Sequence, residues 1–454
     1  MICTKDLKTK KGFTLIEALV LLFIFSLITI TFYRVYTVGL QYIINSKNRL
    51  AAVALANEKM EIVRNLDFED IAHTTGDPPG NLNQNENVAR GSMLFHVFTQ
   101  IKNEDDPFDG TLGGNPNDAN YVDYKYVKIT VSWNDGQYRV FLSSRFVPPG
   151  IEQPVAGKGV LVVNVSSDKA EGAMVPQSTV RIQNSDTGFD ETHSTDDQGR
   201  LMLIGISEAS KKYKITVTKN GYETVSTLPP YPETSYNPTH EHVSVIAGAI
   251  NPADIYQNQL SDLLLETKDY LGNSVPGIDF HLTGGRKLGT DPNSIPPDNP
   301  VYSTDADYVT GSDGKKDFGT TNPGQYAFTL QEPGYKLIGI NPTSPASLMP
   351  GQSMTLNVKV SPENVTALLV TVQESDNNNP LSGASVHLTN ASGYDVTLTT
   401  GNDGMVFFPN TETPSFDSGT YDLSVINSGY QNYSGQVIVN NNELKEEPVP
   451  LVAQ

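Results

Sequence analysis

The first apolar run of the chain is long enough to cross a membrane. From Phe13 to Tyr33 every residue is apolar or carries only a hydroxyl group, except Glu17. A helix of about 20 residues spans the hydrocarbon core of a bilayer and satisfies its own backbone hydrogen bonds there. Lysines at positions 5, 8, 10 and 11 precede the run, and such a basic flank stays in the cytoplasm. The pattern predicts a membrane-spanning helix with the rest of the chain outside the cytoplasm.

The helix is predicted to continue after the apolar run, over residues 13–66 in total. Its second half has an apolar stripe at helical spacing that Lys59 interrupts. The predicted stripe consists of Ala52, Leu55, Ala56, Ile62, Val63 and Leu66. At 1.5 Å per residue the helix would be about 80 Å long, apolar in its first half and amphipathic in its second.

Alternation of apolar and polar residues replaces the helical period between Arg90 and Val147. The segments "SMLFHVFTQI", "YKYVKITVSW" and "QYRVFLSSRFV" alternate as half-buried strands do. Asp135 and Gly136, between the last two segments, predict a type I′ hairpin turn. We expect a small antiparallel sheet within residues 67–150 that packs on the amphipathic half of the helix.

The rest of the chain repeats one order of signals three times. Each copy has an apolar strand, a second strand, a turn of the Asp-Gly type, a strand led by tyrosine, and a Gly-Tyr pair. The three turns are "DDQG", "SDGK" and "NDGM". Tyr213, Tyr326 and Tyr421 lead the tyrosine strands and are predicted to point inward. The spacing between copies is long enough for a complete domain. We therefore expect three β-sandwiches, over residues 155–247, 258–362 and 366–454.

Composition narrows the class of protein and its partners. A chain of 454 residues is too long for one core, and its 37 glycines and 29 prolines favour short strands joined by turns. The formal net charge of -20 argues against nucleic acid as a partner, because phosphates attract Lys and Arg. The sole cysteine, Cys3, precedes the apolar run, so no intramolecular disulfide can form.

The N-terminal motif "KKGFTLIEALV" resembles the class III signal peptide of type IV prepilins and type II secretion pseudopilins. It combines a basic leader, a glycine, an aromatic residue and a glutamate before a long apolar run. The stretch "ALANEKMEIVRNLDFEDI" resembles the same region of minor pilins. The resemblance implies that residues 1–12 are a leader, that a prepilin peptidase cuts between Gly12 and Phe13, and that Phe13 becomes N-methylated.

The same resemblance implies an assembly role for Glu17. A carboxylate within a membrane helix costs roughly 2.5–3.5 kcal/mol on insertion scales. The N-terminal ammonium of a neighbouring subunit would offset this cost and fix the stagger between helices. The alternative is a glutamate tolerated near the interface of an ordinary signal anchor.

The three repeats resemble carboxypeptidase regulatory-like and collagen-adhesin B-type modules, which have a transthyretin-like sandwich. This resemblance implies non-catalytic stalk or binding units. The expected fold class is therefore α+β: a pilin-like N-terminal helix packed on a small antiparallel sheet, followed by three all-β sandwich domains of transthyretin or immunoglobulin type.

The loop "KNEDDPFDGTLGGNPNDANYVD" contains the candidate metal ligands. Its acidic residues are Glu104, Asp105, Asp106, Asp109, Asp118 and Asp123. Carboxylate oxygens suit Ca²⁺, and some pseudopilins hold calcium in a comparable loop. Asp105, Asp106 and Asp109 are the candidate ligands. The spacing does not match an EF-hand, so a solvated acidic loop is the alternative, and no other cofactor is expected.

The chain is not expected to be an enzyme. It contains no H-E-x-x-H, G-x-S-x-G or P-loop motif. His240 and His242 would share one face of a strand, but two ligands are too few for a zinc site.

Two classes of function fit these patterns. The first is a minor type IV pilin at or near the tip of a pilus or pilus-like fibre, where a bulky extension avoids clashes between subunits. Its partners would be prepilin peptidase, other pilin subunits, the cytoplasmic (inner) membrane, and a surface protein or glycan. It would span the membrane once before assembly and reach the cell surface afterwards. The second is a surface adhesin on an unprocessed anchor, and a type II secretion pseudopilin is a variant of the first.

Overall fold

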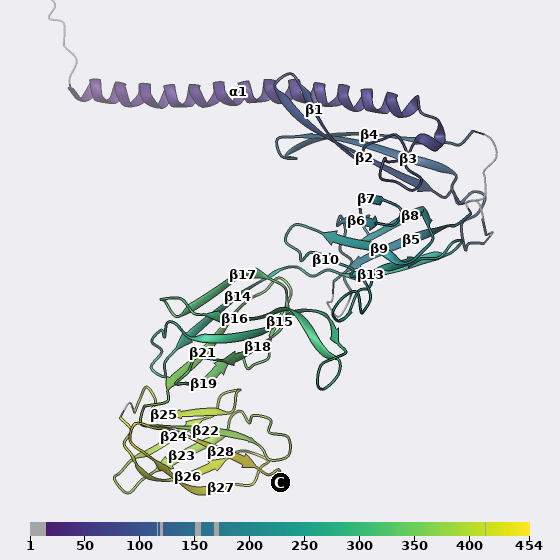
Figure 1. Ribbon diagram of the computed structural model, residues 1–454. Coiled ribbons are helices and arrows are strands. Elements are labelled where there is room, and N and C mark those ends of the chain that lie inside the picture. Colours follow the sequence, from purple (N-terminus) through teal and green to yellow (C-terminus); the bar gives the residue numbers. More distant parts are fainter. Residues whose placement is uncertain (1–14, 116, 119–120, 150–155, 168–171, 414) are drawn as a thin grey trace, which may run out of the picture. The chain divides into compact units, whose positions relative to one another are not determined.

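The structure is a computed structural model that describes residues 15–115, 117–118, 121–149, 156–167, 172–413 and 415–454. The chain divides into two compact units, Met1–Val155 (unit 1) and Ala156–Gln454 (unit 2). The fold class is α+β, as expected: unit 1 contains a long helix packed on a small sheet, and unit 2 consists of β-sandwiches (Figure 1).

The long helix of unit 1 is continuous over all of its described length. It is α1 (Leu15–Arg64), and it ends two residues before the expected position. Hydroxyl groups of Ser26, Thr29 and Thr31 donate to carbonyl oxygens three or four residues earlier, each at 2.8 Å. These polar side chains are therefore satisfied within the helix, which suits an apolar environment.

The sheet of unit 1 is antiparallel, in the order β1-β2-β3-β4. Its strands are β1 (Asn85–Arg90), β2 (Met93–Glu104), β3 (Tyr124–Trp133) and β4 (Tyr138–Phe146), and a short 3-10 helix, η1 (Phe68–Asp70), follows α1. In the turn between β3 and β4, Gln137 N donates to Asn134 O at 3.0 Å. Asp135 and Gly136 between them have φ values of 51° and 82°, both positive, as the central residues of a type I′ turn require.

The second half of α1 packs on this sheet, as Figure 1 shows. The core joins helix residues to strand residues: Ala52, Leu55, Ala56, Met60 and Val63 meet Phe95, Val97, Ile101, Val127, Ile129, Val131 and Trp133. The prediction was wrong for Ile62, which is 44% exposed, whereas Met60 is fully buried. The two lie about 160° apart around the helix axis, and the sheet covers the side on which Met60 lies. Lys59 lies at the edge of the contact, where its ammonium pairs with Glu86 at 2.6 Å.

Unit 2 contains three sandwiches of two sheets each, here called module 1 (158–256), module 2 (261–362) and module 3 (367–451). Module 1 has β5 (Lys158–Ser166), β6 (Thr179–Asn184), β7 (Phe189–Ser194), β8 (Arg200–Ser207), β9 (Ala209–Thr218), β10 (Val225–Ser226), β12 (Val243–Val245) and β13 (Ile250–Tyr256). Its sheets are β13-β5-β8 and β10-β9-β6-β7, with β12 beside β9. The first sandwich was expected to end at residue 247, but β13 belongs to its sheet, so it extends to Tyr256.

Modules 2 and 3 repeat this arrangement. Module 2 has β14 (Ser261–Lys268), β15 (Asp279–Asp291), β16 (Asn299–Val309), β17 (Lys315–Thr321), β18 (Gly324–Leu330), β19 (Tyr335–Asn341), β20 (Ala346–Leu348) and β21 (Ser353–Pro362). Module 3 has β22 (Ala367–Glu374), β23 (Ser385–Thr389), β24 (Asp395–Thr399), β25 (Met405–Phe408), β26 (Gly419–Ile426), β27 (Tyr433–Val439) and β28 (Leu444–Leu451). In every module the last strand lies parallel to the first: β13 to β5, β21 to β14 and β28 to β22.

The repeated tyrosines are core residues, as expected. Tyr213, Tyr326 and Tyr421 are at most 1% exposed. Each hydroxyl donates at 2.7 Å to a main-chain carbonyl four to six residues earlier in the chain. Burial of the ring is therefore combined with a satisfied polar tip. The tyrosines of the Gly-Tyr pairs pack against the three cores from partly buried positions, and the glycines before them have positive φ.

The repeated turn glycines have one structural role in all three modules. Gly199, Gly314 and Gly404 have φ values between 69° and 71°. Each accepts a hydrogen bond at 2.8 Å from a main-chain N–H of the first strand of its module. A Cβ atom at these positions would lie 2.6–3.0 Å from a carbonyl oxygen of that strand. Only glycine fits both the backbone conformation and the close approach.

Modules 2 and 3 share a small second core. It contains Ile338 from module 2 with Ala367, Leu369, Phe407 and Leu444 from module 3. The Ile340 N–H also donates to the Asp403 carboxylate at 2.7 Å. The junction between these modules is therefore packed, with both apolar and polar contacts across it.

Candidate functional site

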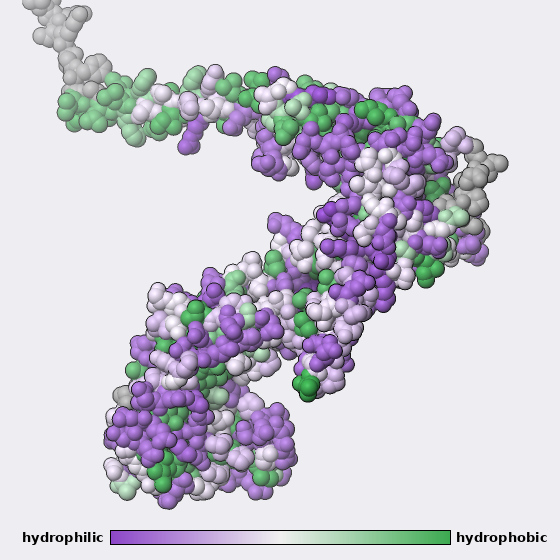
Figure 2. Space-filling model, in the orientation of Figure 1, coloured by the Kyte–Doolittle hydropathy of each residue, from purple (hydrophilic) through white to green (hydrophobic). Residues whose placement is uncertain are grey.

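The first half of α1 presents apolar side chains to its surroundings. Leu22 and Phe25 are each 68% exposed, and apolar surface covers this end of the helix in Figure 2. The segment Leu19–Arg64 contains a stretch that is long and apolar enough to cross a membrane, by length and composition. Burial of this surface in a bilayer or against other helices would remove it from water.

The residues of the N-terminal motif lie at or before the start of this helix. Gly12 and Phe13 fall outside the described residues. Glu17 lies within the first turn of α1 as described. The cleavage, methylation and assembly roles of these residues stay predictions.

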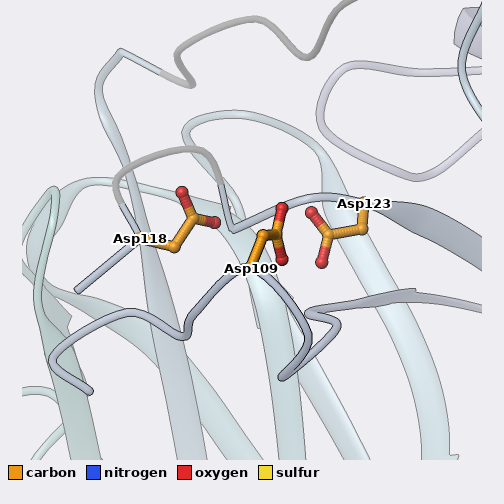
Figure 3. Close-up of side chains that lie close together, drawn as sticks. All are labelled: Asp109, Asp118 and Asp123. Carbon is orange, nitrogen blue, oxygen red and sulfur yellow. The ribbon is translucent and has the colours of Figure 1, made fainter. Parts of the chain in front are cut away.

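The acidic loop between β2 and β3 brings three carboxylates together. Asp109, Asp118 and Asp123 each offer an oxygen within 4.8 Å of the others, and their carboxylates face one another in Figure 3. Oxygens on opposite sides of a Ca²⁺ ion are about 4.6–5.2 Å apart, since each lies about 2.3–2.6 Å from the ion. Three carboxylates at this spacing therefore suit a hard divalent cation.

The end of the sheet positions these carboxylates. Asp123 directly precedes β3, where its N–H donates to Glu104 O at 3.1 Å, and its side chain is 7% exposed. Asp118 is held in the loop by its N–H, which donates to Thr111 O at 3.1 Å. Asp109 is exposed, so the cluster opens to solvent on the side of this residue.

The other two candidate ligands have different contacts. Asp106 Oδ1 accepts from Phe108 N at 3.1 Å, within its own turn, and its N–H donates to the Asp123 carboxylate. Asp105 Oδ2 accepts from Leu112 N at 3.1 Å. Burial raises the pKa of the Asp105 carboxyl, and the charges of Asp123, Asp118 and Asp109 raise it further. Asp105 therefore lies beside the cluster, and the main-chain N–H of Asp106 donates to one of its carboxylates. Of the three predicted ligands, Asp109 is the one that lies within the cluster.

The two neighbouring histidines of module 1 have separate surroundings. His242 Nδ1 lies 3.1 Å from the Thr227 hydroxyl, and burial lowers the pKa of its imidazole. His240 packs near the ring of Tyr256, with centroids 6.0 Å apart. Among the described residues neither belongs to a cluster of potential metal ligands.

Comparisons with known proteins give only distant structural similarities. No family model matches the chain, and neither does any curated protein. The Bacillus anthracis TIE protein is 13% identical with a TM-score of 0.20, over 82% of this chain and 73% of that chain. A streptococcal ancillary pilin is 15% identical with a TM-score of 0.19, over 65% and 99%. GBS52, the minor pilin of Streptococcus agalactiae, is 15% identical with a TM-score of 0.18, over 43% and 96%. These values assign no family.

Proposed function

We propose that the chain is a structural subunit of a type IV pilus or pilus-like fibre, at or near its tip, and that its modules are displayed for adhesion. The observation that carries the proposal is α1. One uninterrupted helix combines an exposed apolar first half with a second half that is packed on a small sheet. The first half suits the membrane before assembly and a bundle of identical helices afterwards.

The N-terminal sequence supports a type IV fibre in particular. A glycine followed by an aromatic residue and "TLIE" stands between a basic leader and the apolar run. Each module has a hydrophobic core of its own, filled by aliphatic and aromatic side chains. The modules would therefore be the folded domains that the fibre displays.

Mass spectrometry of the N-terminal peptide tests this proposal. The peptide is recovered from sheared surface fibres and from membranes of the same cells. We expect the fibre fraction to contain a peptide that begins at N-methylated Phe13. An intact Met1 terminus confined to membranes would overturn the proposal and favour the anchored adhesin.

We propose Asp109, Asp118 and Asp123 as the ligands of the predicted calcium ion, in place of the predicted set Asp105, Asp106 and Asp109. Addition of 1 mM Ca²⁺, about the level at which extracellular calcium modules bind, is expected to slow hydrogen exchange in residues 105–123. Asp109→Asn is expected to remove this protection, because it takes away one of the three charges without changing the size of the side chain. Asp135→Asn, in the turn between β3 and β4, is the matched control. Equal exchange with and without Ca²⁺ would identify a solvated acidic loop instead.

A further inference from the structure

We propose that the junction of modules 1 and 2 is a binding pocket for a peptide in which a carboxylate lies next to an apolar side chain. The inference deepens the display role proposed above, for which it supplies a site and a class of ligand. It concerns unit 2 alone, so its test does not depend on whether the chain enters a fibre.

Two segments that module 3 lacks build this junction. In module 2, β15 spans 13 residues and β16 spans 11, whereas the equivalent strands β23 and β24 span 5 each. In module 1, a long segment between β10 and β12 contains β11 (Asn237–Pro238). β11 pairs with the extended end of β15, through Asn237 with Thr290 and Pro238 with Gly289. Module 1 thus adds a strand to a sheet of module 2.

A buried ion pair crosses the same junction. Arg286 Nη1 lies 2.5 Å from Glu223 Oε1, and the two side chains are 13% and 1% exposed. The same Glu223 oxygen also accepts from Asn258 N at 2.8 Å. Glu223 thereby fixes the Arg286 guanidinium from the side of module 1. A guanidinium has five N–H donors, and the structure describes no other partner for those of Arg286.

Glycines allow the backbone to form the bend that places Arg286. The register of β15 against β16 shifts between Gly284 and Lys287. Gly285 has a φ of 76°, and a Cβ atom on it would lie 2.7 Å from Ser303 Oγ. A Cβ atom on Gly324, on the adjacent strand, would lie 2.2 Å from Gly285 O. Such bulges redirect side chains at the ends of sheets, and here they direct two consecutive cations, Arg286 and Lys287, toward the junction.

The resulting pocket has a volume of about 690 Å³, within the range typical of ligand sites. Most of its lining is apolar, with Tyr256, Leu348 and Met349 among the contributors. Arg286 and Lys287 also line it. Lys287 is exposed, and no ion pair of its ammonium is found in the described part of the chain.

The basic side chains and the apolar lining of the pocket together favour a ligand that has both an anionic group and an apolar group. Arg and Lys together bind a carboxylate through charge-assisted hydrogen bonds, while the apolar lining favours an aromatic or aliphatic group. Residues 156–454 contain 34 acidic and 16 basic residues, so the pocket places two basic side chains within an acidic unit. Charges further away than about 8 Å are largely screened at physiological salt. Because Glu223 balances the charge of Arg286, Lys287 supplies the net positive charge at the pocket.

A peptide fits better than an acidic sugar. A sugar presents hydroxyl groups around its ring, which gain little from the mostly apolar exposed surface of the pocket, although Thr239, His240, Asn258, Gln325 and Ser347 also line it. In addition, Ser347 and Leu348 of the lining belong to β20, which ends its sheet, and β18 is its ladder partner. An edge strand offers main-chain groups to an extended peptide.

Fluorescence anisotropy with the full-length chain in phosphatidylcholine nanodiscs tests the proposal. The probes are labelled hexapeptides with the central pair Phe-Asp, Phe-Asn or Gly-Asp between glycines. We expect the Phe-Asp peptide to bind, and each of the other two to bind about tenfold more weakly or worse, since each lacks one of the two recognised groups. Absence of binding, or equal binding of all three, would overturn the proposal.

Variants of the pocket make the test specific to this site. Lys287→Gln is expected to weaken Phe-Asp binding about five- to tenfold, and Lys287→Arg to restore most of it, because arginine keeps the charge. Lys359→Gln, at an exposed lysine of the same module outside the pocket, is the matched control and should bind normally. An equal loss in both glutamine variants would contradict the proposed site.

A competition experiment separates the two classes of ligand. Tetragalacturonic acid serves as the acidic glycan. We expect it to leave Phe-Asp binding unchanged at concentrations at which unlabelled peptide competes. Displacement of the peptide by the glycan at equal concentration would overturn the choice of a peptide. If no peptide binds in any of these experiments, the proposal of fibre assembly is not affected, since it is tested by the N-terminal peptide in sheared fibres.

Discussion

Replacement of Glu17 by glutamine is expected to reduce incorporation of the chain into surface fibres at least about tenfold while leaving membrane insertion intact. The amide has the size of the carboxylate but no charge, so it would lose the proposed ion pair with the N-terminal ammonium of a neighbouring subunit. A charge within the apolar part of a membrane helix is unfavourable, so its removal does not hinder insertion. Immunoblots of sheared fibres and of membranes from the same cells measure both quantities.

The matched control for this experiment lies on the same helix. Glu61 is exposed in the amphipathic half of α1 and pairs with Arg64 one turn away. Exposed pairs of this kind contribute little to stability, so Glu61→Gln should enter fibres as the natural chain does. Normal incorporation of Glu17→Gln would refute the assembly role of this residue, and a loss from both membranes and fibres would show a defect in insertion instead.

Substitution of Gly404 by alanine is expected to destabilise module 3 by about 3–4 kcal/mol, through left-handed strain and displacement of the first strand. Gly404 has a φ of 71°, and its added Cβ would lie 2.6 Å from Val372 O. The atom it meets is main chain, which has no rotamer to change. Hydrogen exchange of β22 and β28 measures the loss, because these paired strands open when the module unfolds.

Gly429 provides the control, since it shares the positive φ of Gly404 but has free space where a Cβ atom would lie. Its φ is 85°, but a Cβ atom there would meet nothing within 4 Å. Gly429→Ala should therefore cost only the conformational penalty, about 1 kcal/mol. Equal losses of stability in the two variants would show that the close approach of the main chain at Gly404 does not contribute to the destabilisation.

Features that depend on neighbouring residues could be predicted from the sequence. The inward tyrosines follow from alternation along one strand, and the turn at Asp135 and Gly136 follows from two adjacent residues. The helix was predicted to within two residues of its C-terminal end for a similar reason, because its period extends over many turns. Ile62 was predicted to lie in the core but is exposed, and Met60 lies in the core instead. This difference shows the limit of a prediction from periodicity. It indicates that a helix has an apolar face, but the partner sheet decides how far that face extends.

Features that depend on distant residues could not be predicted. β13 lies parallel to β5, and Asn164 donates to Asp254 at 2.8 Å although 90 residues separate them. The acidic loop shows the same limit at shorter range. All six of its acidic residues are visible in the sequence, yet the path of the loop decides that Asp109 meets Asp118 and Asp123. No local signal connects Arg286 to Glu223, since their contact depends on how two modules pack.

The parallel pairing of the first and last strands has a mechanical consequence. When tension acts along the chain, it pulls the N-terminal end of β5 and the C-terminal end of β13 in opposite directions. Because these strands lie side by side and parallel, the force runs along the ladder and loads its hydrogen bonds together, not one after another. The same holds for β14 with β21. Modules 1 and 2 are thus built to resist forces that pull their two ends apart.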